Sequence, residues 1–278
     1  MAANFRFSKM HGAGNDFVLV DLRNDTPAPD VRTLRLLADR HRGVGCDQVL
    51  TIEPPHSAQA IAAYRIWNAD GTPAQQCGNG ARCVAAWLRR DAAVSDTHFV
   101  LDSPSGTHAV DAHADDDFTI AMGNPDFAPA SIPLLVDVER SLYSLDVHDE
   151  PILFGAVSMG NPHALIEVTD VAAAPVHKLG AAIQAMREFS DSVNVGFAQV
   201  IAPDRIKLRV FERGVGETLA CGSGACAAVA ILVRQGCVDR DVAVELPGGT
   251  LRIAWPRDDA PISMRGPATF VFEGEWNP

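Results

Sequence analysis

The sequence predicts an α/β (α+β) fold of two pseudo-symmetric domains, each a mostly antiparallel β-sheet or barrel wrapped around a central buried helix. Segments rich in β-branched and apolar residues outnumber helical ones. Two of the helical segments are apolar on almost every face, which is typical of helices enclosed by other elements. Two short motifs also recur about half a chain apart, so we expect a duplicated unit with the functional site in the interdomain cleft.

Strands are expected where β-branched and apolar residues are bounded by turn residues. These segments are 17–22, 48–53, 62–68 and 98–103 in the first half, and 156–168, 193–201, 205–212 and 242–255 in the second. Helices are expected from apolar spacing at 31–40, 80–92, 179–186 and 224–235. Gly236 directly follows the last of these and is a natural helix stop.

The length of 278 residues and the 47% hydrophobic content allow two domains with substantial cores. A stretch rich in proline and small residues at 122–135 predicts the boundary between them. We therefore expect an N-terminal domain at 1–121 and a C-terminal domain at 122–266. The final stretch, 267–278, contains a strand-like segment that is expected to pair back onto the first domain.

The formal net charge of −12 disfavours nucleic acids and anionic membranes as partners. No apolar stretch reaches the roughly 20 residues that a membrane helix needs, and the first residues lack the apolar core of a signal peptide. The six cysteines have neither the pattern of a disulfide framework nor the spacing of a zinc site. These features predict a cytoplasmic protein that holds no metal and acts on a small molecule.

The duplicated motifs each contain a cysteine followed by two glycines. Cys77 begins the run CGNG, and Cys221 begins the run CGSG 144 residues later. Three further polar pairs keep nearly the same offset: Asn68 with Glu212, Asn15 with Asn161, and Gln48 with Asn194. Coincidental glycine-rich turns would not place four polar pairs at nearly one offset. A duplicated unit with a site between its copies is therefore favoured.

A cysteine at the start of a helix has distinctive chemistry. First-turn N–H groups lack intrahelical partners and carry partial positive charge, which lowers a thiol pKa from its usual value of about 8.5. The glycines are expected to expose the sulfur and to let a carboxylate approach the free N–H groups. Two such motifs facing one another suit proton transfer at a stereocentre, because one thiolate removes the α-proton while the opposite thiol delivers another.

Other roles are open to these cysteines. A redox disulfide between Cys77 and Cys221 is the main competitor, whereas a cysteine–histidine nucleophile would explain only one of the two. The remaining cysteines, which are expected to be buried inert thiols, are Cys46, Cys83, Cys226 and Cys237.

Pyridoxal phosphate offers another route to an amino-acid stereocentre, and it needs a Schiff-base lysine. The chain has three lysines, Lys9, Lys178 and Lys207, and none lies in a convincing sequence context for this cofactor. We therefore predict that the chain uses no cofactor.

Several side chains are candidates for binding the ligand. Amides both donate and accept hydrogen bonds, so Asn15, Gln48, Asn68, Asn161 and Asn194 suit a ligand with ammonium and carboxylate groups. Glu212 is a candidate for the ammonium group and Arg213 for a carboxylate. Ala69 stands where the first repeat would carry a counterpart of Arg213, so we expect a ligand whose charged far end lies to one side. His163 either tunes a cysteine or satisfies strand backbone.

Five motifs together resemble the diaminopimelate epimerase family. They are HGAGNDFVLVD, NADGTPAQQCGNGARC, MGNPHA, VNVGF and ERGVGETLACGSGACA, and they follow this order along the whole chain. The two cysteine motifs alone would also be similar to those of proline racemases. The Asn-Gly of the first motif and the ERG before the second favour the diaminopimelate branch.

The resemblance implies an isomerase that interconverts LL-2,6- and meso-2,6-diaminopimelate without a cofactor, in lysine and peptidoglycan precursor biosynthesis. It also implies a cytoplasmic homodimer with Cys77 and Cys221 as the acid–base pair. His163 and Glu212 are implied to modulate the thiol pKa values. The implied substrate-binding residues are Asn15, Gln48, Asn68, Gly78, Asn79, Asn161, Asn194, Glu212, Arg213, Gly222 and Ser223.

Two alternative functions stay open from the residues alone. One is a two-cysteine racemase or epimerase for another substrate, of the proline or hydroxyproline type. The other is a non-catalytic amino-acid-binding or thiol-redox protein. The chain also departs from the family pattern at Cys46, where an aromatic residue or alanine is frequent, and at Gln75, where glutamate is frequent. Gln75 is expected to alter the electrostatic field at Cys77 slightly.

Overall fold

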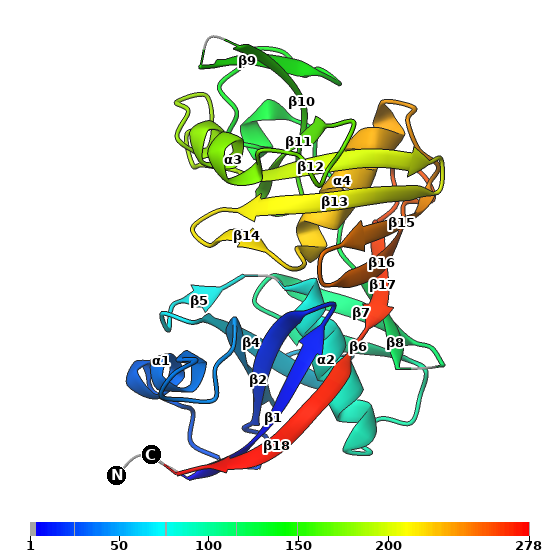
Figure 1. Cartoon of the computed structure of the whole chain (residues 1–278). Coiled ribbons are helices and arrows are strands. Elements are labelled where there is room, and N and C mark those ends of the chain that lie inside the picture. Colours follow the sequence, from blue (N-terminus) through cyan, green and yellow to red (C-terminus); the bar gives the residue numbers. More distant parts are fainter. Residues whose placement is uncertain (1–3, 25, 76, 115, 149, 278) are drawn as a thin grey trace. The chain divides into compact units, whose positions relative to one another are not determined.

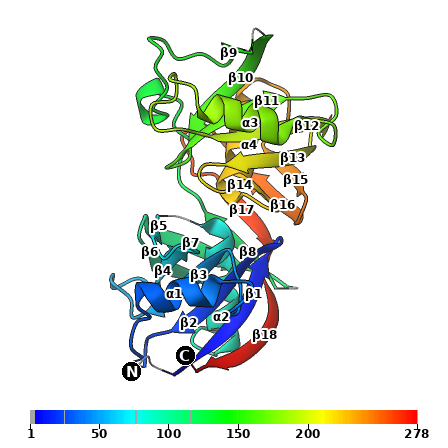
Figure 2. The same ribbon diagram turned by 60° about the vertical axis from the view of Figure 1, so that its left-hand side comes forward.

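The computed structural model describes residues 4–24, 26–75, 77–114, 116–148 and 150–277. The chain divides into two compact units: unit 1 is Met1–Ala121 with Arg265–Pro278, and unit 2 is Met122–Met264. Figures 1 and 2 show the strands and helices of each unit. None of the helices in the described ranges is long and apolar enough to cross a membrane.

Unit 1 is built from strands with two helices between them. Its elements are β1 (Phe5–Gly12), β2 (Asn15–Asp21), α1 (Val31–Ala38), β3 (Gln48–Glu53), β4 (Ala62–Asn68), β5 (Pro73–Ala74), α2 (Gly78–Arg90), β6 (His98–Ser103), β7 (Gly106–Ala112), β8 (Asp117–Ala121) and β18 (Thr269–Trp276). The C-terminal β18 pairs antiparallel with β1.

After two additional elements, unit 2 repeats the order of β1 to β7. Its elements are the 3₁₀ turn η1 (Pro129–Ser131), β9 (Tyr143–Val147), β10 (Glu150–Ser158), β11 (Pro162–Glu167), α3 (Val176–Gln184), β12 (Asn194–Ala202), β13 (Arg205–Glu212), β14 (Gly216–Thr218), α4 (Gly222–Arg234), β15 (Asp241–Leu246) and β16 (Gly249–Ala254). The strand β17 (Ser263–Pro267) runs across the boundary between the units in sequence and pairs with β8.

The strand pairings show the duplication directly. In unit 1, β2 pairs parallel with β3, β3 antiparallel with β4, and β4 parallel with β6. In unit 2, β11 pairs parallel with β12, β12 antiparallel with β13, and β13 parallel with β15. The antiparallel hairpins β1–β2 and β10–β11 also correspond. The predicted pseudo-symmetric fold with mostly antiparallel strands is therefore confirmed.

Each unit encloses one apolar helix. Helix α2 lies against β1, β2, β3 and β8, and α4 lies against β10, β11, β12, β13 and β16 (Figure 1). Nearly every residue of both helices is buried, as their lack of a polar face predicts.

A second, shorter helix packs on the sheet of each unit. Leu34 and Leu37 of α1 join a core cluster with Val18 and Val20 of β2 and Val49 of β3, while α3 lies against β12 and β13. The run of four buried residues from Phe17 to Val20 fits a strand that is covered on both faces.

The two central helices end in the same way. After α4, Gly236 adopts φ +74°, its N–H donates to Val233 O, and the N–H of Cys237 donates to Leu232 O. This pair of bonds is a Schellman motif, so Gly236 stops the helix as predicted. After α2, the same left-handed position is taken by Ala92, with φ +56°.

The predicted element boundaries needed some correction. Both central helices begin two residues earlier than predicted, at Gly78 and Gly222, because the preceding cysteines occupy the N-cap positions and the glycines form the first turn. The segment 156–168, predicted as one strand, contains the end of β10 and all of β11, separated by a turn at Gly160 with φ +86°.

Candidate active site

Cys77 and Cys221 are the N-cap residues of the two central helices. Both have extended backbone angles, with φ −149° and ψ 100° for Cys77 and φ −109° and ψ 107° for Cys221. Each sulfur therefore lies beside first-turn N–H groups, and the N–H of Gly80 donates to Cys77 Sγ over 3.4 Å. A side chain at Gly224 would meet Cys221 Sγ at 3.1 Å, so glycine leaves room for the second thiol.

Asn15 lies beside the first thiol and is held there by Asn79. Cys77 is half-buried, and its Sγ lies 3.7 Å from Asn15 Oδ1. The same Asn15 oxygen accepts a hydrogen bond from Asn79 Nδ2 at 3.2 Å. Asn15 is the first residue of β2 and follows the tight turn at Gly14, which has φ +86°. The β1–β2 hairpin therefore brings Asn15 to the N-terminus of α2.

Gln48 and Asn68 form a second polar pair in unit 1. They are direct partners in the β3–β4 register, and Gln48 Nε2 donates to Asn68 Oδ1 over 3.0 Å. The Asn68 amide in turn donates to Thr72 Oγ1 over 3.1 Å. The antiparallel register thus places together two candidates that lie twenty residues apart in the sequence.

The second thiol differs from the expectation. Cys221 is buried, with 4% of its surface exposed, instead of presenting an exposed sulfur. Its Sγ donates to Glu212 Oε2 over 3.2 Å and lies 3.7 Å from Ser223 Oγ. Burial and the charge of Glu212 raise the pKa of Cys221 well above its ordinary value, so the expected lowering by the helix N-terminus is wrong here. Cys221 is protonated at neutral pH in this state.

Thr218 holds the carboxylate that faces Cys221. Its Oγ1 donates to Glu212 Oε1, the oxygen opposite to the one that accepts from the thiol. Both residues belong to the paired strands β13 and β14, whose register places Glu212 opposite Gly216. The two oxygens of Glu212 are thereby engaged by neighbours from its own motif.

His163 lies behind Asn161 in unit 2. It is buried on β11, and its Nε2 lies 2.9 Å from Asn161 Oδ1. Burial and the charge of Arg213 lower the pKa of His163 to about 3, so the ring is neutral and Nε2–H donates to the amide oxygen. Asn161 Nδ2 then donates to Ser223 Oγ over 3.4 Å. Through Asn161 and Ser223, His163 is connected to the neighbourhood of Cys221.

Asn194 fixes the backbone at Arg213. It is buried and opposes His163 in the parallel β11–β12 pairing. Its Oδ1 accepts from the backbone N–H of Arg213 over 2.9 Å, and its Nδ2 donates to Pro162 O over 2.9 Å. The Arg213 guanidinium forms an ion pair with Asp191 at 2.8 Å. Because Asp191 is largely exposed, a ligand carboxylate would exchange with it at little cost.

Equivalent side chains make equivalent contacts in the two units. Asn79 Nδ2 donates to Asn15 Oδ1 in unit 1, and Asn161 Nδ2 donates to Ser223 Oγ in unit 2. In each unit, the second residue after the N-cap cysteine contacts an asparagine at the start of a strand. Asn15 is the first residue of β2, and Asn161 directly precedes β11. The duplicated motif thus pairs the same two positions at each helix N-terminus, but the direction of the hydrogen bond is reversed between the units.

The other cysteines are mostly structural. Cys46, Cys83 and Cys226 are buried as predicted, and burial raises the pKa of Cys46 and of Cys83 to about 12. Cys237 was expected to be buried, but it is only partly so, because it follows the exposed turn at Gly236. Its pKa is still raised, by burial and by Glu167.

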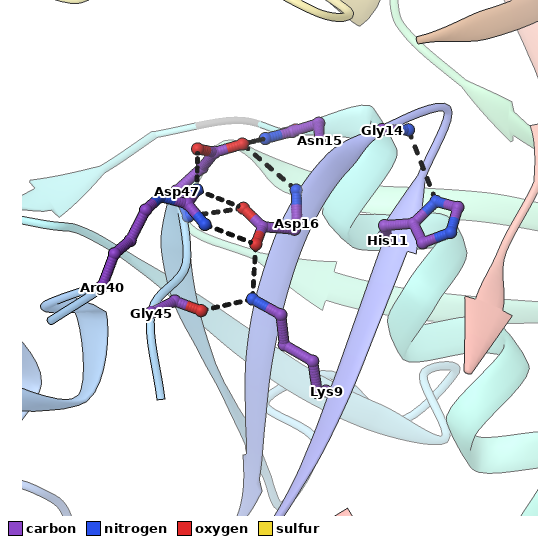
Figure 3. Close-up of polar contacts among 8 residues, drawn as sticks. All are labelled: Lys9, His11, Gly14, Asn15, Asp16, Arg40, Gly45 and Asp47. Carbon is purple, nitrogen blue, oxygen red and sulfur yellow. Dashed lines mark hydrogen bonds and ion pairs between the residues drawn. The ribbon is translucent and has the colours of Figure 1, made fainter. Parts of the chain in front are cut away.

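Two residues of the site were missed in the sequence. Asp47 directly precedes Gln48, and its carboxylate accepts from Asn15 Nδ2 over 2.9 Å (Figure 3). Thr218 lies in the ERGVGET motif, and its hydroxyl was not considered as a partner of Glu212. Both residues lie next to, or in the same motif as, a predicted site residue, and this was the only signal in the sequence. The sequence does not show in which direction their side chains point.

The structure also groups the predicted residues by unit. Unit 1 places Asn15, Gln48, Asn68, Cys77, Gly78 and Asn79 at the N-terminus of α2 or on the adjoining strands. Unit 2 places Asn161, His163, Asn194, Glu212, Arg213, Cys221, Gly222 and Ser223 around α4 in the same way.

Known proteins match this chain over nearly its full length. The family model for diaminopimelate epimerase matches residues 7–128 and 155–271. A diaminopimelate epimerase of Xanthomonas euvesicatoria pv. vesicatoria is 60% identical over 277 residues, covering 99% of this chain and 98% of the relative. That of Xylella fastidiosa strain 9a5c is 56% identical, covering 97% of this chain and 95% of the relative.

Solved structures of distant sequence share the fold. A hydroxyproline epimerase from Agrobacterium vitis has a TM-score of 0.72 at 16% identity, with 99% of this chain and 93% of that one covered. A phenazine biosynthesis protein of the PhzF family from Bacillus anthracis has a TM-score of 0.72 at 15% identity, covering 99% and 100%. These likenesses concern the fold, whereas the family-model match and the 60% identity establish that the chain belongs to the diaminopimelate epimerase family.

Proposed function

We propose that the chain interconverts LL- and meso-2,6-diaminopimelate by moving a proton at one Cα, without a cofactor. The observation that carries the mechanism is that Cys77 and Cys221 cap equivalent helices in the two halves of a duplicated fold. The diaminopimelate epimerases at 60% identity support this substrate. They favour it over the proline-type racemase and over a non-catalytic binding or redox protein.

The proton transfer needs one thiolate and one thiol on opposite faces of the substrate. Cys221 donates to Glu212, so we assign it as the thiol that acts as the acid. Cys77, whose Sγ donates to Asn15 Oδ1 in this structure, is assigned as the base after it has lost that proton to solvent. The Cys77 thiolate takes the α-proton, and the bonding electron pair stays on Cα. Cys221 delivers its proton to the other face of Cα and is left as a thiolate. The reverse reaction exchanges the two roles, so one site serves both directions.

The helix N-termini are proposed to stabilise the intermediate. The first-turn N–H groups of Gly78, Asn79, Gly222 and Ser223 would bind the carboxylate next to the reacting carbon. Negative charge that develops on Cα in the transition state is delocalised toward that carboxylate, so fixed N–H dipoles lower the barrier.

The remaining candidates are proposed to hold the charged groups of the substrate. Arg213 would bind the distal carboxylate in exchange for Asp191, and Glu212 would face an ammonium group. The amides of Asn15, Gln48, Asn68, Asn161 and Asn194 would complete the recognition of ammonium and carboxylate groups. His163 and Glu212 would also tune the neighbouring thiol.

We further propose that the protein acts in the cytoplasm as a homodimer, with no nucleic acid or membrane partner. The net charge of −12 supports the expected absence of nucleic acid and membrane partners. Sedimentation of the reduced protein at several concentrations tests the dimer.

The direct test of the substrate is conversion of LL-diaminopimelate by the purified, reduced protein with no added cofactor. The expected product is the meso isomer. Replacing Arg213 by alanine should reduce turnover of diaminopimelate strongly. Proline and hydroxyproline are assayed for comparison, and a preference for either of them over diaminopimelate would contradict the proposal. The absence of any α-proton exchange would contradict it as well.

A further inference from the structure

We propose that Asp47 is a positioning residue for the reaction, because it fixes the side-chain amide of Asn15 with its oxygen toward Cys77. This inference rests on the proposed function, in which Asn15 borders the reacting thiol. Asp47 belongs to none of the duplicated polar pairs, and it lies in the connection between α1 and β3. Figure 3 shows Asp47 and its neighbours.

The orientation of the Asn15 amide follows from what its neighbours can donate. A carboxylate can only accept hydrogen bonds, so the NH₂ group of Asn15 must be the end that faces Asp47, at 2.9 Å. The amide oxygen then points to the other side, where it lies 3.2 Å from Asn79 Nδ2 and 3.7 Å from Cys77 Sγ. Asn79 favours the same orientation from the oxygen side, and Asp47 is the partner that holds the NH₂ end of the Asn15 amide.

Asp47 is itself held from several sides. Its Oδ1 accepts from Arg40 over 2.7 Å, and its Oδ2 also accepts from the backbone N–H of Asp16 over 3.1 Å. The backbone N–H of Asp47 donates back to Asp16 Oδ1 over 2.9 Å. These reciprocal bonds join the start of β2 to the residue before β3, so the Asp47 carboxylate has little freedom to move.

A partly buried charge cluster anchors this loop. Lys9 is buried on β1 and donates to Asp16 and to the carbonyl oxygen of Gly45 (Figure 3). Arg40 binds both carboxylate oxygens of Asp16, at 2.7 and 3.0 Å. Although burial opposes ionisation, the hydrogen bonds from Arg40 and Lys9 keep the pKa of Asp16 well below its usual range. Asp16 is therefore charged, and it ties the loop to the strands on which Asn15 lies.

The second repeat has no counterpart of the Lys9, Asp16 and Asp47 arrangement at the matching positions. At the offset of 146 residues that relates Asn15 to Asn161, the positions of Lys9, Asp16 and Asp47 are taken by Gly155, Pro162 and Val193. Unit 2 orients Asn161 with His163 and Ser223 instead. The Asp47 arrangement thus concerns the surroundings of Cys77 alone.

The geometry predicts a larger effect on activity than on stability. Asp47 and Arg40 are about half exposed, at 46% and 54% of their side-chain surfaces, and such ion pairs contribute about 0–1 kcal/mol to folding. Misorientation of a group beside the reacting atoms, in contrast, can cost about tenfold or more in rate.

A double-mutant cycle tests the proposal with the full-length, reduced enzyme and diaminopimelate as substrate. Asp47→Ala should lower kcat/KM about tenfold in the otherwise unchanged protein and less than about twofold in an Asn15→Ala background, because Asp47 acts through Asn15. Asp47→Asn keeps an oxygen acceptor and should recover most of the loss. Arg42→Gln removes the neighbouring exposed ion pair with Asp39 and serves as the matched control, with unchanged activity expected.

The outcomes separate this inference from the proposed function. An inactive wild-type enzyme would contradict the proposed function, whereas an active one with equal Asp47→Ala losses in both backgrounds would overturn the positioning role. Asp47→Ala activity within twofold of wild type would overturn it as well. If Asp47→Ala does not fold, the cycle is run with Asp47→Ser, which also removes the carboxylate that holds the Asn15 amide. An Asp47→Ser loss that persists undiminished in the Asn15→Ala background would then refute the proposal.

Discussion

Cys221 Sγ donates a hydrogen bond to Glu212 Oε2 over 3.2 Å, and burial together with this carboxylate of its own motif keeps the thiol of the second repeat protonated. The first repeat has Asn68 at the corresponding position, and that amide accepts from Gln48 instead. The two halves of the fold are therefore alike in backbone and different in electrostatics. In the proposed mechanism, this difference makes Cys221 the thiol that acts first as the acid.

Glu212→Gln should make Cys221 more reactive. The substitution removes the negative charge that disfavours the thiolate, so the raised pKa of Cys221 should fall and the thiolate fraction at pH 8 should increase. The rate of alkylation by iodoacetamide at pH 8, followed by mass spectrometry of the Cys221 peptide, checks this. Alkylation of Cys83 in the same samples is the control, and an unchanged or slower reaction at Cys221 would contradict the assignment.

Thr218→Val should impair the enzyme through Glu212. The valine keeps the side-chain shape but removes the hydroxyl that engages Glu212 Oε1, so the carboxylate loses its fixed direction toward Cys221. We expect kcat/KM for diaminopimelate to fall about tenfold. Thr218→Ser retains a hydroxyl and should stay within about threefold of wild type. Equal losses in the two variants would argue against a role for the hydrogen bond.

Ala92→Gly should stabilise the protein. Ala92 occupies the left-handed position after α2 that Gly236 occupies after α4, and a side chain there costs about 1–2 kcal/mol, partly offset by the greater unfolded-state entropy of glycine. A net gain of about 0.5–1 kcal/mol is expected, with a Tm increase of about 2 °C in scanning calorimetry. Gly236→Ala should shift the Tm in the opposite direction. A Tm decrease for Ala92→Gly would contradict this account of the helix ends.

His163 should make stability depend on pH. Its folded pKa of about 3 lies below the usual value of 6.5, so the unfolded chain binds a proton that the folded one does not. The free energy of unfolding is therefore unaffected by the protonation of His163 above pH 6.5. Between pH 6.5 and about 3 it falls by about 1.4 kcal/mol for each pH unit of acidification. Urea unfolding at pH 7, 6 and 5 measures the effect.

The matched variant for this measurement is His163→Gln, which keeps a donor for Asn161 and cannot titrate. The difference in unfolding free energy between wild type and variant should change with pH in favour of the variant at low pH. Parallel pH profiles for the two proteins would show that His163 is not held neutral in the fold.

The regular part of the fold was predictable from local patterns. The central helices follow from apolar runs after the cysteines, and the pseudo-symmetry follows from the constant offset between Cys77 and Cys221. Short strands were not predictable in this way. The three residues of β14, Gly216–Thr218, are a strand only because β13 lies beside them.

The site was predictable in its residues but not in its electrostatics. The repeated motifs identified both Glu212 and Cys221. The burial that raises the pKa of Cys221, however, depends on packing against β13, where Val210 approaches Gly224. Asp47 was missed because its role depends on which way one amide faces. Such directions are set by contacts between segments that are distant in the sequence.

The central claim is that Cys77 and Cys221 form one two-base device, and proton exchange in deuterated solvent tests it most directly. Cys77→Ser and Cys221→Ser are each assayed, reduced and without cofactor, for conversion of LL-diaminopimelate and for incorporation of deuterium at Cα. The account predicts that the wild-type product carries one deuterium at the inverted centre and that each single variant loses at least about 100-fold in turnover. Full epimerase turnover by either single variant would contradict it.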